Sequence, residues 1–527
     1  MTKISRREIL RRSAGLACIA ASRAHIARAF SGVAPRAHWD VRLAAKLALD
    51  PRRPQYHLLP KAYWMNDPDG PIYWKGNYHM FFQYNPNGAY WGDMHWGHAV
   101  SPDMIHWRHL PVALAPTPGG PDAAGCFSGS SLIDGERLAV LYTGVVTVPT
   151  TEATLYDGVH SFRESQCLAY SNDSDLKFWT KLPGPVIAAP PKHLSVTGFR
   201  DPSPWRHGNE WLMTVGSGFP QKGGAVLLYR SQNLRHWDYL HPLITSNAPG
   251  GRTVNPVDSG DMWECPDFFP LGNMHVLIYS TQGTSRWMTG EFDQQSLTFR
   301  PEQSGILDTG AFYAAKTQTD KSGNRILWGW IPERRRIEQY RAAGWAGLMS
   351  LPRVLTLGND RRLRMRIAPE VRRLRLAEQK LSLAGNEEQR SQQIGRMTIQ
   401  AACGEIACLV QRDKQVFGLA LYAEPRGGDN AVTCLSLRFD PASPDRINLD
   451  NDTLPLASGN ASTEIRLNID SSIIEVIVDN RVAHTKRFYL PGNQPRNLRL
   501  KWIGSTAIIT TLSVWQIAPI SRDRLTT

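Results

Sequence analysis

The stretch GNYHMFFQY, residues 76–84, sets the pattern on which the fold prediction rests: a Gly-Asn turn pair followed by a short apolar and aromatic strand. Such turn pairs and strands are typical of antiparallel β-structure. Four more segments have a turn pair before such a strand, Asp134-Gly135 in one and Gly-Asn in the other three, at intervals of between 50 and 73 residues. The repeated strands are expected at residues 78–84, 138–143, 211–216, 275–280 and 325–330.

Five similar units of this length predict a five-bladed β-propeller, which we place at residues 50–355. A β-sandwich is the alternative for these strands, but the repetition favours radial closure. The composition then changes, and residues 356–378 are expected to form a linker. Short alternating strands return in residues 379–527 and predict a C-terminal β-sandwich, so the whole chain is expected to be all-β. Its strands are expected at 416–422, 432–439, 464–469, 473–478, 498–502 and 508–515.

A polar residue stands 10 to 12 residues before each repeated strand of the propeller: Asp67, Ser128, Asp201, Glu264 and Tyr313. Equivalent positions on the innermost strands of a propeller converge on its central channel. We therefore expect the three acids to face one another in one cleft. Asp-Pro pairs that merely cap turns are the alternative for any one of them. Three acids at matched offsets, flanked by Trp, Phe or Arg, favour a shared site.

Length and composition limit the classes of protein to which the chain can belong. A chain of 527 residues with 42% hydrophobic and 20% charged residues predicts a globular protein of at least two domains. No uncharged apolar run reaches the roughly 18 residues of a membrane-spanning helix, so no membrane anchoring is expected. The net charge of +13 falls to +7 without residues 1–30. Nucleic-acid binding is not expected, because no basic module is recognisable.

The N-terminal segment is similar to a twin-arginine export signal. Arg6 and Arg7 form the arginine pair, residues 14–21 are weakly apolar, and residues 27–29 offer a small-x-small cleavage site. A basic disordered tail is the alternative. We expect residues 1–30 to be a signal peptide, and the mature protein to be periplasmic or secreted.

Metal and redox sites are not expected. The seven cysteines show no CxxC spacing, although a bridge from Cys434 to Cys403 or Cys408 stays open. His95 and His98 have a spacing that could bind a metal, but no acidic or cysteine cluster with ligand spacing accompanies them. Neither a metal nor another cofactor is predicted.

Three motifs together resemble glycoside hydrolase family 32, which includes invertases, levanases, inulinases and fructosyltransferases. They are WMNDP at 64–68, FRDP at 199–202 and WECP at 263–266. The likeness continues through residues 82–86, 127–130 and 345–353, and covers roughly residues 55–355. The family's first motif usually ends in Asn-Gly, whereas this chain has Asp69-Gly70.

The resemblance implies a β-propeller followed by a β-sandwich and a role for each acid. Asp67 is expected to be the nucleophile, Glu264 the general acid/base and Asp201 the stabiliser of the transition state. Retaining glycosidases use two such carboxyls about 5–5.5 Å apart. A fructoside substrate is expected to bind Trp64, Asn66, Gln83, Trp91, Phe127, Ser128, Arg200 and Tyr313. For Trp91, a place in the core is the alternative.

The expected activity is hydrolysis of terminal β-D-fructofuranosyl residues from sucrose or fructans through a covalent fructosyl-enzyme. A fructosyltransferase that uses the same intermediate is the alternative, and Trp64 at the head of the first motif favours the hydrolase. A carbohydrate-binding propeller without catalysis is disfavoured, because a pure binder does not need both Asp67 and Glu264. The sequence does not predict the preferred fructoside or the oligomeric state.

Overall fold

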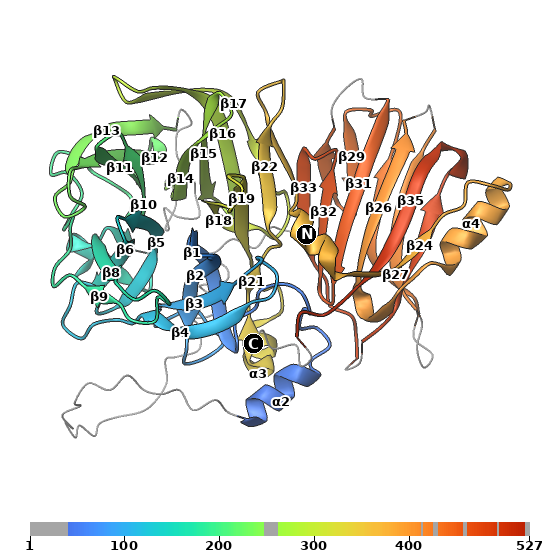
Figure 1. The fold of residues 1–527 in the computed structure, drawn as a ribbon, viewed down its shortest axis with the longest axis horizontal. Helices are drawn as coiled ribbons and strands as arrows, with labels where there is room; N and C mark the ends of the chain where they lie inside the picture. The colour runs from blue at the N-terminus through green and yellow to red at the C-terminus, as the bar shows by residue number, and fades with distance from the viewer. Residues whose placement is uncertain are drawn as a thin grey trace.

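A computed structural model describes residues 41–156, 158–246, 262–412, 415–424, 430–456, 461–492 and 495–521. The predicted export signal at residues 1–30 lies outside these ranges. Figure 1 shows two parts side by side, with five sheets set around an axis on one side and two packed sheets on the other. No helix of the described residues combines the length and the apolar composition that a membrane crossing requires.

The first part is built from five sheets, in which all strand pairs except that of β20 with β1 are antiparallel. The first holds β1 (Tyr63–Trp74), β2 (Asn77–Asn85), β3 (His95–Ser101), β4 (Arg108–Leu114) and β20 (Trp345–Ala346). The second holds β5 (Gly125–Asp134), β6 (Arg137–Thr147), β7 (Leu155–Tyr156), β8 (Ser161–Ser171) and β9 (Thr180–Lys181). The third holds β10 (Phe199–His207), β11 (Glu210–Phe219), β12 (Gly223–Ser231) and β13 (Asp238–Thr245). The fourth holds β14 (Glu264–Leu271), β15 (Met274–Thr281), β16 (Thr284–Asp293) and β17 (Thr298–Ile306). The fifth holds β18 (Tyr313–Thr319), β19 (Arg325–Ile331), β21 (Leu348–Met349), β22 (Arg353–Leu357) and β23 (Leu363–Ile367).

These sheets form a closed ring. The first strands β1, β5, β10, β14 and β18 contact one another in that order, and β18 also contacts β1. The ring is tied by β20, which pairs in parallel with β1 at Tyr63–Trp345 and Trp64–Ala346. The five strands that the turn pairs predicted are the second strands β2, β6, β11, β15 and β19, so the five-bladed propeller is confirmed.

The second part is a β-sandwich of two six-stranded sheets. One has β24 (Arg375–Lys380), β35 (Ile509–Ile517), β26 (Cys403–Gln411), β31 (Ser462–Asp470), β32 (Ile473–Val478) and β33 (Val482–Arg487). The other has β25 (Thr398–Ile399), β34 (Leu498–Ile503), β27 (Phe417–Ala423), β28 (Val432–Phe439), β29 (Arg446–Leu449) and β30 (Asp452–Pro455). The apolar side chains of both sheets form one shared core.

Helices are few and short. They are α2 (Val41–Leu49), α3 (Ile337–Ala343), α4 (Glu387–Arg396), and the 3₁₀ turns η1 (Thr150–Glu152), η2 (Pro369–Leu374), η3 (Gln400–Ala402) and η4 (Thr506–Ile508). The six cysteines of the described residues are all free, so the bridge considered for Cys434 is not formed.

The boundary between the two parts differs from the predicted one. β22 and β23 pair with β19 and complete the fifth sheet, so the propeller extends to Ile367 rather than to residue 355. β24 already belongs to the sandwich. Residues 356–378 are therefore not a free linker. The part up to Ile367 is hydrogen-bonded into the fifth propeller sheet, the part from Arg375 is hydrogen-bonded into the sandwich, and η2 lies between these two parts.

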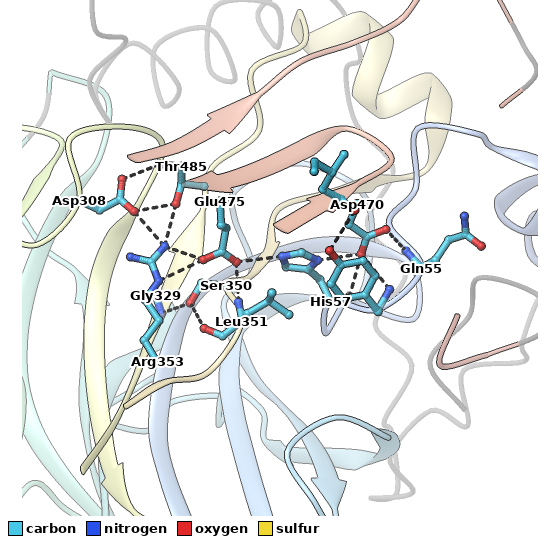
Figure 2. A network of polar contacts seen from close by, with 12 residues as sticks. Gln55, His57, Asp308, Gly329, Ser350, Leu351, Arg353, Asp470, Glu475 and Thr485 are labelled. Atoms are coloured by element: carbon cyan, nitrogen blue, oxygen red, sulfur yellow. Dashed lines mark hydrogen bonds and ion pairs between the residues drawn. The ribbon is translucent and has the colours of Figure 1, made fainter. Parts of the chain in front are cut away.

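A buried ionic network joins the two parts (Figure 2). His57, which precedes β1, contacts Asp470 at 2.8 Å and Glu475 at 3.0 Å in the sandwich. Arg353 of β22 lies 2.6 Å from Glu475 and 2.9 Å from Asp308. All five side chains are at most 1% exposed.

The network shifts the pKa values of its members. Burial alone would lower the pKa of His57, but the hydrogen bonds and charges of Asp470 and Glu475 raise it to about 9. Burial would raise the pKa of Glu475, but Arg353 and His57 lower it to about 2. The interface therefore holds a charged histidine between carboxylates at neutral pH.

Candidate active site

The first strand of every blade carries a break in its pairing register near its N-terminal end. The breaks lie between Met65 and Pro68, Phe127 and Gly129, Arg200 and Ser203, Glu264 and Asp267, and Tyr313 and Lys316. Such β-bulges bend a strand and redirect its side chains. Five bulges in a ring therefore aim residues from distant parts of the chain at one place.

The register corrects one expectation from the sequence. Glu264 is the last paired residue before its bulge, whereas Asp201 lies inside its bulge. The residue that matches Asp201 in the fourth blade is Cys265, and both have left-handed backbone angles, with φ of 64° and 51°. The predicted acids are therefore not at strictly equivalent positions, although each lies in the bulge of its strand or directly beside it.

Asp67 is 1% exposed and both of its carboxyl oxygens have partners. Asn66 donates to Oδ1 at 3.0 Å, and Ser128 of the second blade donates to Oδ2 at 2.8 Å. Trp64 in turn donates from its indole nitrogen to Asn66 at 2.8 Å. This chain of hydrogen bonds fixes the direction of the Asp67 carboxyl.

Cys265 connects Asp67 with Asp201. Its sulfur lies 3.7 Å from Asp67 Oδ2 and 3.5 Å from Asp201 Oδ2, and its backbone N–H donates to Asp201 at 2.8 Å. Burial raises the pKa of Asp201 to about 6; the charges of Glu264 and Asp67 add to the rise, and Arg200 opposes it. The neighbouring carboxylates and the burial thus favour the neutral form of Asp201 more than water does.

Glu264 is fully buried and is held through both oxygens. Arg200 donates to Oε1 from Nε at 3.2 Å and from Nη2 at 3.1 Å. The Tyr313 hydroxyl donates to Oε2 at 2.5 Å. The same arginine is anchored on its other side by Glu164 at 2.6 Å. Arg200, on the third blade, thus contacts Glu264 on the fourth blade.

The predicted aromatic residues gather beside these acids. Trp64, Phe127 and Tyr313 share one apolar cluster, and Trp91 packs against it. The rings of Trp91 and Phe127 meet edge to face at 5.9 Å. Trp91 is therefore part of the site's wall. Gln83 donates to Asp69 and to the carbonyl oxygen of Cys126, both at 2.9 Å.

Some residues of the site carried no motif in the sequence. Glu164 on β8 holds Arg200, and Thr143 on β6 accepts a hydrogen bond from the backbone of Asp201 at 2.8 Å. Thr143 lies on the second strand of the second blade and Glu164 on its third strand. Only burial distinguishes these two residues from their neighbours in the sequence. Lys316 is also buried, and bonds to Ser130 at 3.1 Å and to the carbonyl oxygen of Pro266 at 2.9 Å.

Asp69, the departure from the usual motif, is fully buried. Burial, followed by the charge of Asp67, raises the pKa of Asp69 well above its usual value, against the hydrogen bond from Gln83. A neutral carboxyl has nearly the shape of the amide that the family carries there. The raised pKa favours this neutral form of Asp69.

Comparisons with known proteins agree with this geometry. The model of the glycosyl hydrolases family 32 N-terminal domain matches residues 57–368. A sucrose-6-phosphate hydrolase of Escherichia coli is 35% identical over 493 residues, covering 88% of this chain and 94% of that protein. A raffinose invertase of Escherichia coli is 34% identical, covering 88% and 95%.

The solved structures agree as well. A family 32 β-fructofuranosidase of Bombyx mori superposes with a TM-score of 0.72 at 29% identity, covering 91% of this chain and 97% of that one. The match extends over the propeller and the sandwich alike. The chain therefore belongs to glycosyl hydrolase family 32 and is a glycosidase.

Proposed function

We propose that this protein is a retaining β-fructofuranosidase that releases terminal β-D-fructofuranosyl residues from sucrose or fructans. The observation that carries the proposal is the meeting of Asp67, Asp201 and Glu264 in one buried cluster, with Cys265 against two of them. The relatives named above act on sucrose derivatives or raffinose by their names, and this supports a fructoside as substrate.

In the first step, a carboxyl oxygen of Asp67 attacks carbon 2 of the fructosyl group. Glu264 passes its proton to the departing glycosidic oxygen, so that the bond to the leaving sugar breaks as the ester to Asp67 forms. In the second step, water adds to carbon 2, Glu264 takes the proton of the water, and the ester breaks. Fructose leaves, and both acids return to their starting states.

The neighbours of each acid suit these roles. The hydrogen bonds from Asn66 and Ser128 aim the Asp67 carboxyl, and Arg200 and Tyr313 position Glu264. Asp201 would bind fructose hydroxyls more tightly in the transition state than in the ground state. We further propose that the sugar contacts Trp64, Asn66, Gln83, Trp91, Phe127, Ser128, Arg200 and Tyr313.

Isosteric substitutions test the acids. Asp67→Asn and Glu264→Gln should each lower kcat by roughly a thousandfold or more, because each group acts in the bond-breaking step. Asp134→Asn is the matched control, since Asp134 forms a surface pair with Arg137 and should keep full activity. Near-normal turnover in the Asp67→Asn variant would contradict its role as nucleophile.

The stereochemistry of the first product is an independent test. Attack by Asp67 followed by attack of water on the same carbon gives β-fructofuranose first, and methanol should divert part of the intermediate to methyl β-fructofuranoside. NMR during the first turnovers detects both products. An initial α-anomer would show inversion and exclude the covalent intermediate.

Product analysis separates the candidate functions. Sucrose, sucrose 6-phosphate, raffinose, levan and inulin should be incubated with the protein and the products separated by chromatography. Free fructose supports the hydrolase, whereas products longer than the substrate would indicate a fructosyltransferase. Binding of these sugars without turnover would indicate a binding protein.

We also propose export by the twin-arginine route, supported by Arg6 and Arg7. Replacing both by lysine should keep the protein in the cytoplasm, and the exported wild type should begin near residue 30. N-terminal sequencing of exported protein that still starts at Met1 would contradict cleavage.

A further inference from the structure

A run of seven arginines lies between residues 361 and 375, and the proposed activity gives it no role. Four of them have partners: Arg361 with Glu302, Arg362 with Gln303, Arg364 with Asp360 and Arg375 with Glu405. The guanidinium groups of Arg366 and Arg372 have no hydrogen bond or ion pair within the described ranges. Surface ion pairs and hydrogen bonds therefore account for only some of these seven arginines.

Arg366 and Arg372 line a pocket of about 200 Å³ between the propeller and the sandwich. Arg366 comes from β23 and Arg372 from η2, while Arg466 and Asn468 reach the pocket from β31. We call these four residues the interdomain arginine pocket. Donors from both parts of the molecule thus converge on one small volume.

Positive charge exceeds negative charge around this pocket. Two carboxylates, Glu405 and Glu464, also line it. Arg375 binds Glu405 at 2.6 Å, and Arg466 binds Glu464 at 2.7 Å. Arg466 also lies 3.6 Å from Glu405, and the charge of Glu405 acts on Arg372 as well. The four arginines in and beside the pocket, Arg366, Arg372, Arg375 and Arg466, nevertheless outnumber its two carboxylates by two. Burial, and then the charges of Arg466 and Arg375, lower the pKa of Arg372.

Asn468 provides a second, independent indication of a ligand. It lines the pocket and is 2% exposed, yet its amide nitrogen Nδ2 has no hydrogen-bond partner in the described part of the chain. A buried donor without an acceptor costs about 1–3 kcal/mol. An acceptor that reached Nδ2 from the pocket would remove this cost.

We propose that the interdomain arginine pocket binds the phosphate group of inorganic phosphate or of a small phosphomonoester. Phosphate offers oxygens in tetrahedral directions, which suits donors arriving from β23, η2 and β31, and arginine is well matched to it. A dianion balances the excess of two positive charges around the pocket. A volume of about 200 Å³ has room for roughly six water-sized groups, so a short organic substituent also fits.

Calorimetric titration of the full-length protein tests the proposal. The probes are sodium phosphate and glucose 6-phosphate, at an ionic strength held constant with sodium chloride. Arg366→Gln and Arg372→Gln should each weaken binding at least tenfold, and both side chains are exposed enough for the fold to tolerate the change. Arg373→Gln is the matched control: Arg373 is adjacent and exposed but does not line the pocket.

The two probes distinguish the sources of the phosphate. Binding of both probes assigns a phosphomonoester, and binding of phosphate alone assigns the free ion. Absence of binding by both, or equal weakening by Arg373→Gln and Arg372→Gln, would overturn the proposal. Sucrose hydrolysis by the Arg366 and Arg372 variants should equal that of the wild type, so the result is independent of the proposed catalytic roles.

Discussion

Replacing His57 by glutamine should destabilise the contact between propeller and sandwich most below pH 6.5 and least above pH 9. His57 lies fully buried between Asp470 and Glu475, and its pKa in the folded protein is about 9. In an unfolded chain the histidine pKa is about 6.5. A raised pKa gives a stabilisation that is complete below the unfolded value and is lost as the pH rises through the folded one.

The magnitude follows from the two pKa values. Each pKa unit corresponds to about 1.4 kcal/mol, so a rise from 6.5 to about 9 stabilises the folded state by about 3 kcal/mol. The free energy of unfolding of the wild type should therefore fall by about 1.4 kcal/mol per pH unit across this window through His57 alone. Glu475, whose pKa is lowered to about 2, acts in a separate window as the pH falls from 4.5 to 2.

Urea denaturation at pH 6, 7.5 and 9.5 measures this effect. The difference in unfolding free energy between the wild type and His57→Gln should be largest at pH 6 and should shrink by about 3 kcal/mol at pH 9.5. His106→Gln is the control, because His106 is half exposed beside Asp103. A difference that stays constant over this range would refute a charged His57 in the interface.

Three further changes have defined outcomes. Asp69→Asn should stabilise the protein increasingly as the pH rises above 4, because a buried carboxyl with a raised pKa loses stability on ionising; urea denaturation at pH 4 and 7.5 measures this gain. Gly347→Ala should cost more than about 2 kcal/mol in thermal unfolding, because φ is +75° and the new Cβ would lie 1.9 Å from the Met65 carbonyl oxygen. Tyr313→Phe should lower kcat by roughly ten- to a hundredfold and shift the pH–rate profile, since it removes a hydrogen bond to Glu264 that is worth about 1.5–3 kcal/mol.

The sequence predicted the blades well because their signals are local. A turn pair and the strand after it lie within ten residues, and β2, β6, β11, β15 and β19 all begin within one residue of the expected starts. The acids could be found for the same reason, since each has a fixed offset from such a strand. The offset did not determine register, and so Glu264 and Asp201 differ by one position around their bulges.

Contacts between distant segments could not be predicted in this way. Glu164 reaches Arg200 from a third strand, and no spacing in the sequence indicates that pairing. His57 and Glu475 are 418 residues apart. The boundary at residue 355 was misplaced because β22 and β23 take their places in the fifth sheet by pairing with β19, which a change of composition does not reveal.

The parallel pairing of β20 with β1 also sets an order of events during synthesis. The pairing of Trp64 with Ala346 cannot form until Ala346 has been synthesised. A ribosome that adds roughly 5–20 residues per second needs about 15 to 60 s to make the segment between these two residues. Throughout that interval one edge of β1 has no partner, and an open strand edge readily pairs with other chains. The propeller ring therefore closes late in synthesis. The rate of translation relative to the rate of aggregation consequently affects how much folded enzyme a cell obtains.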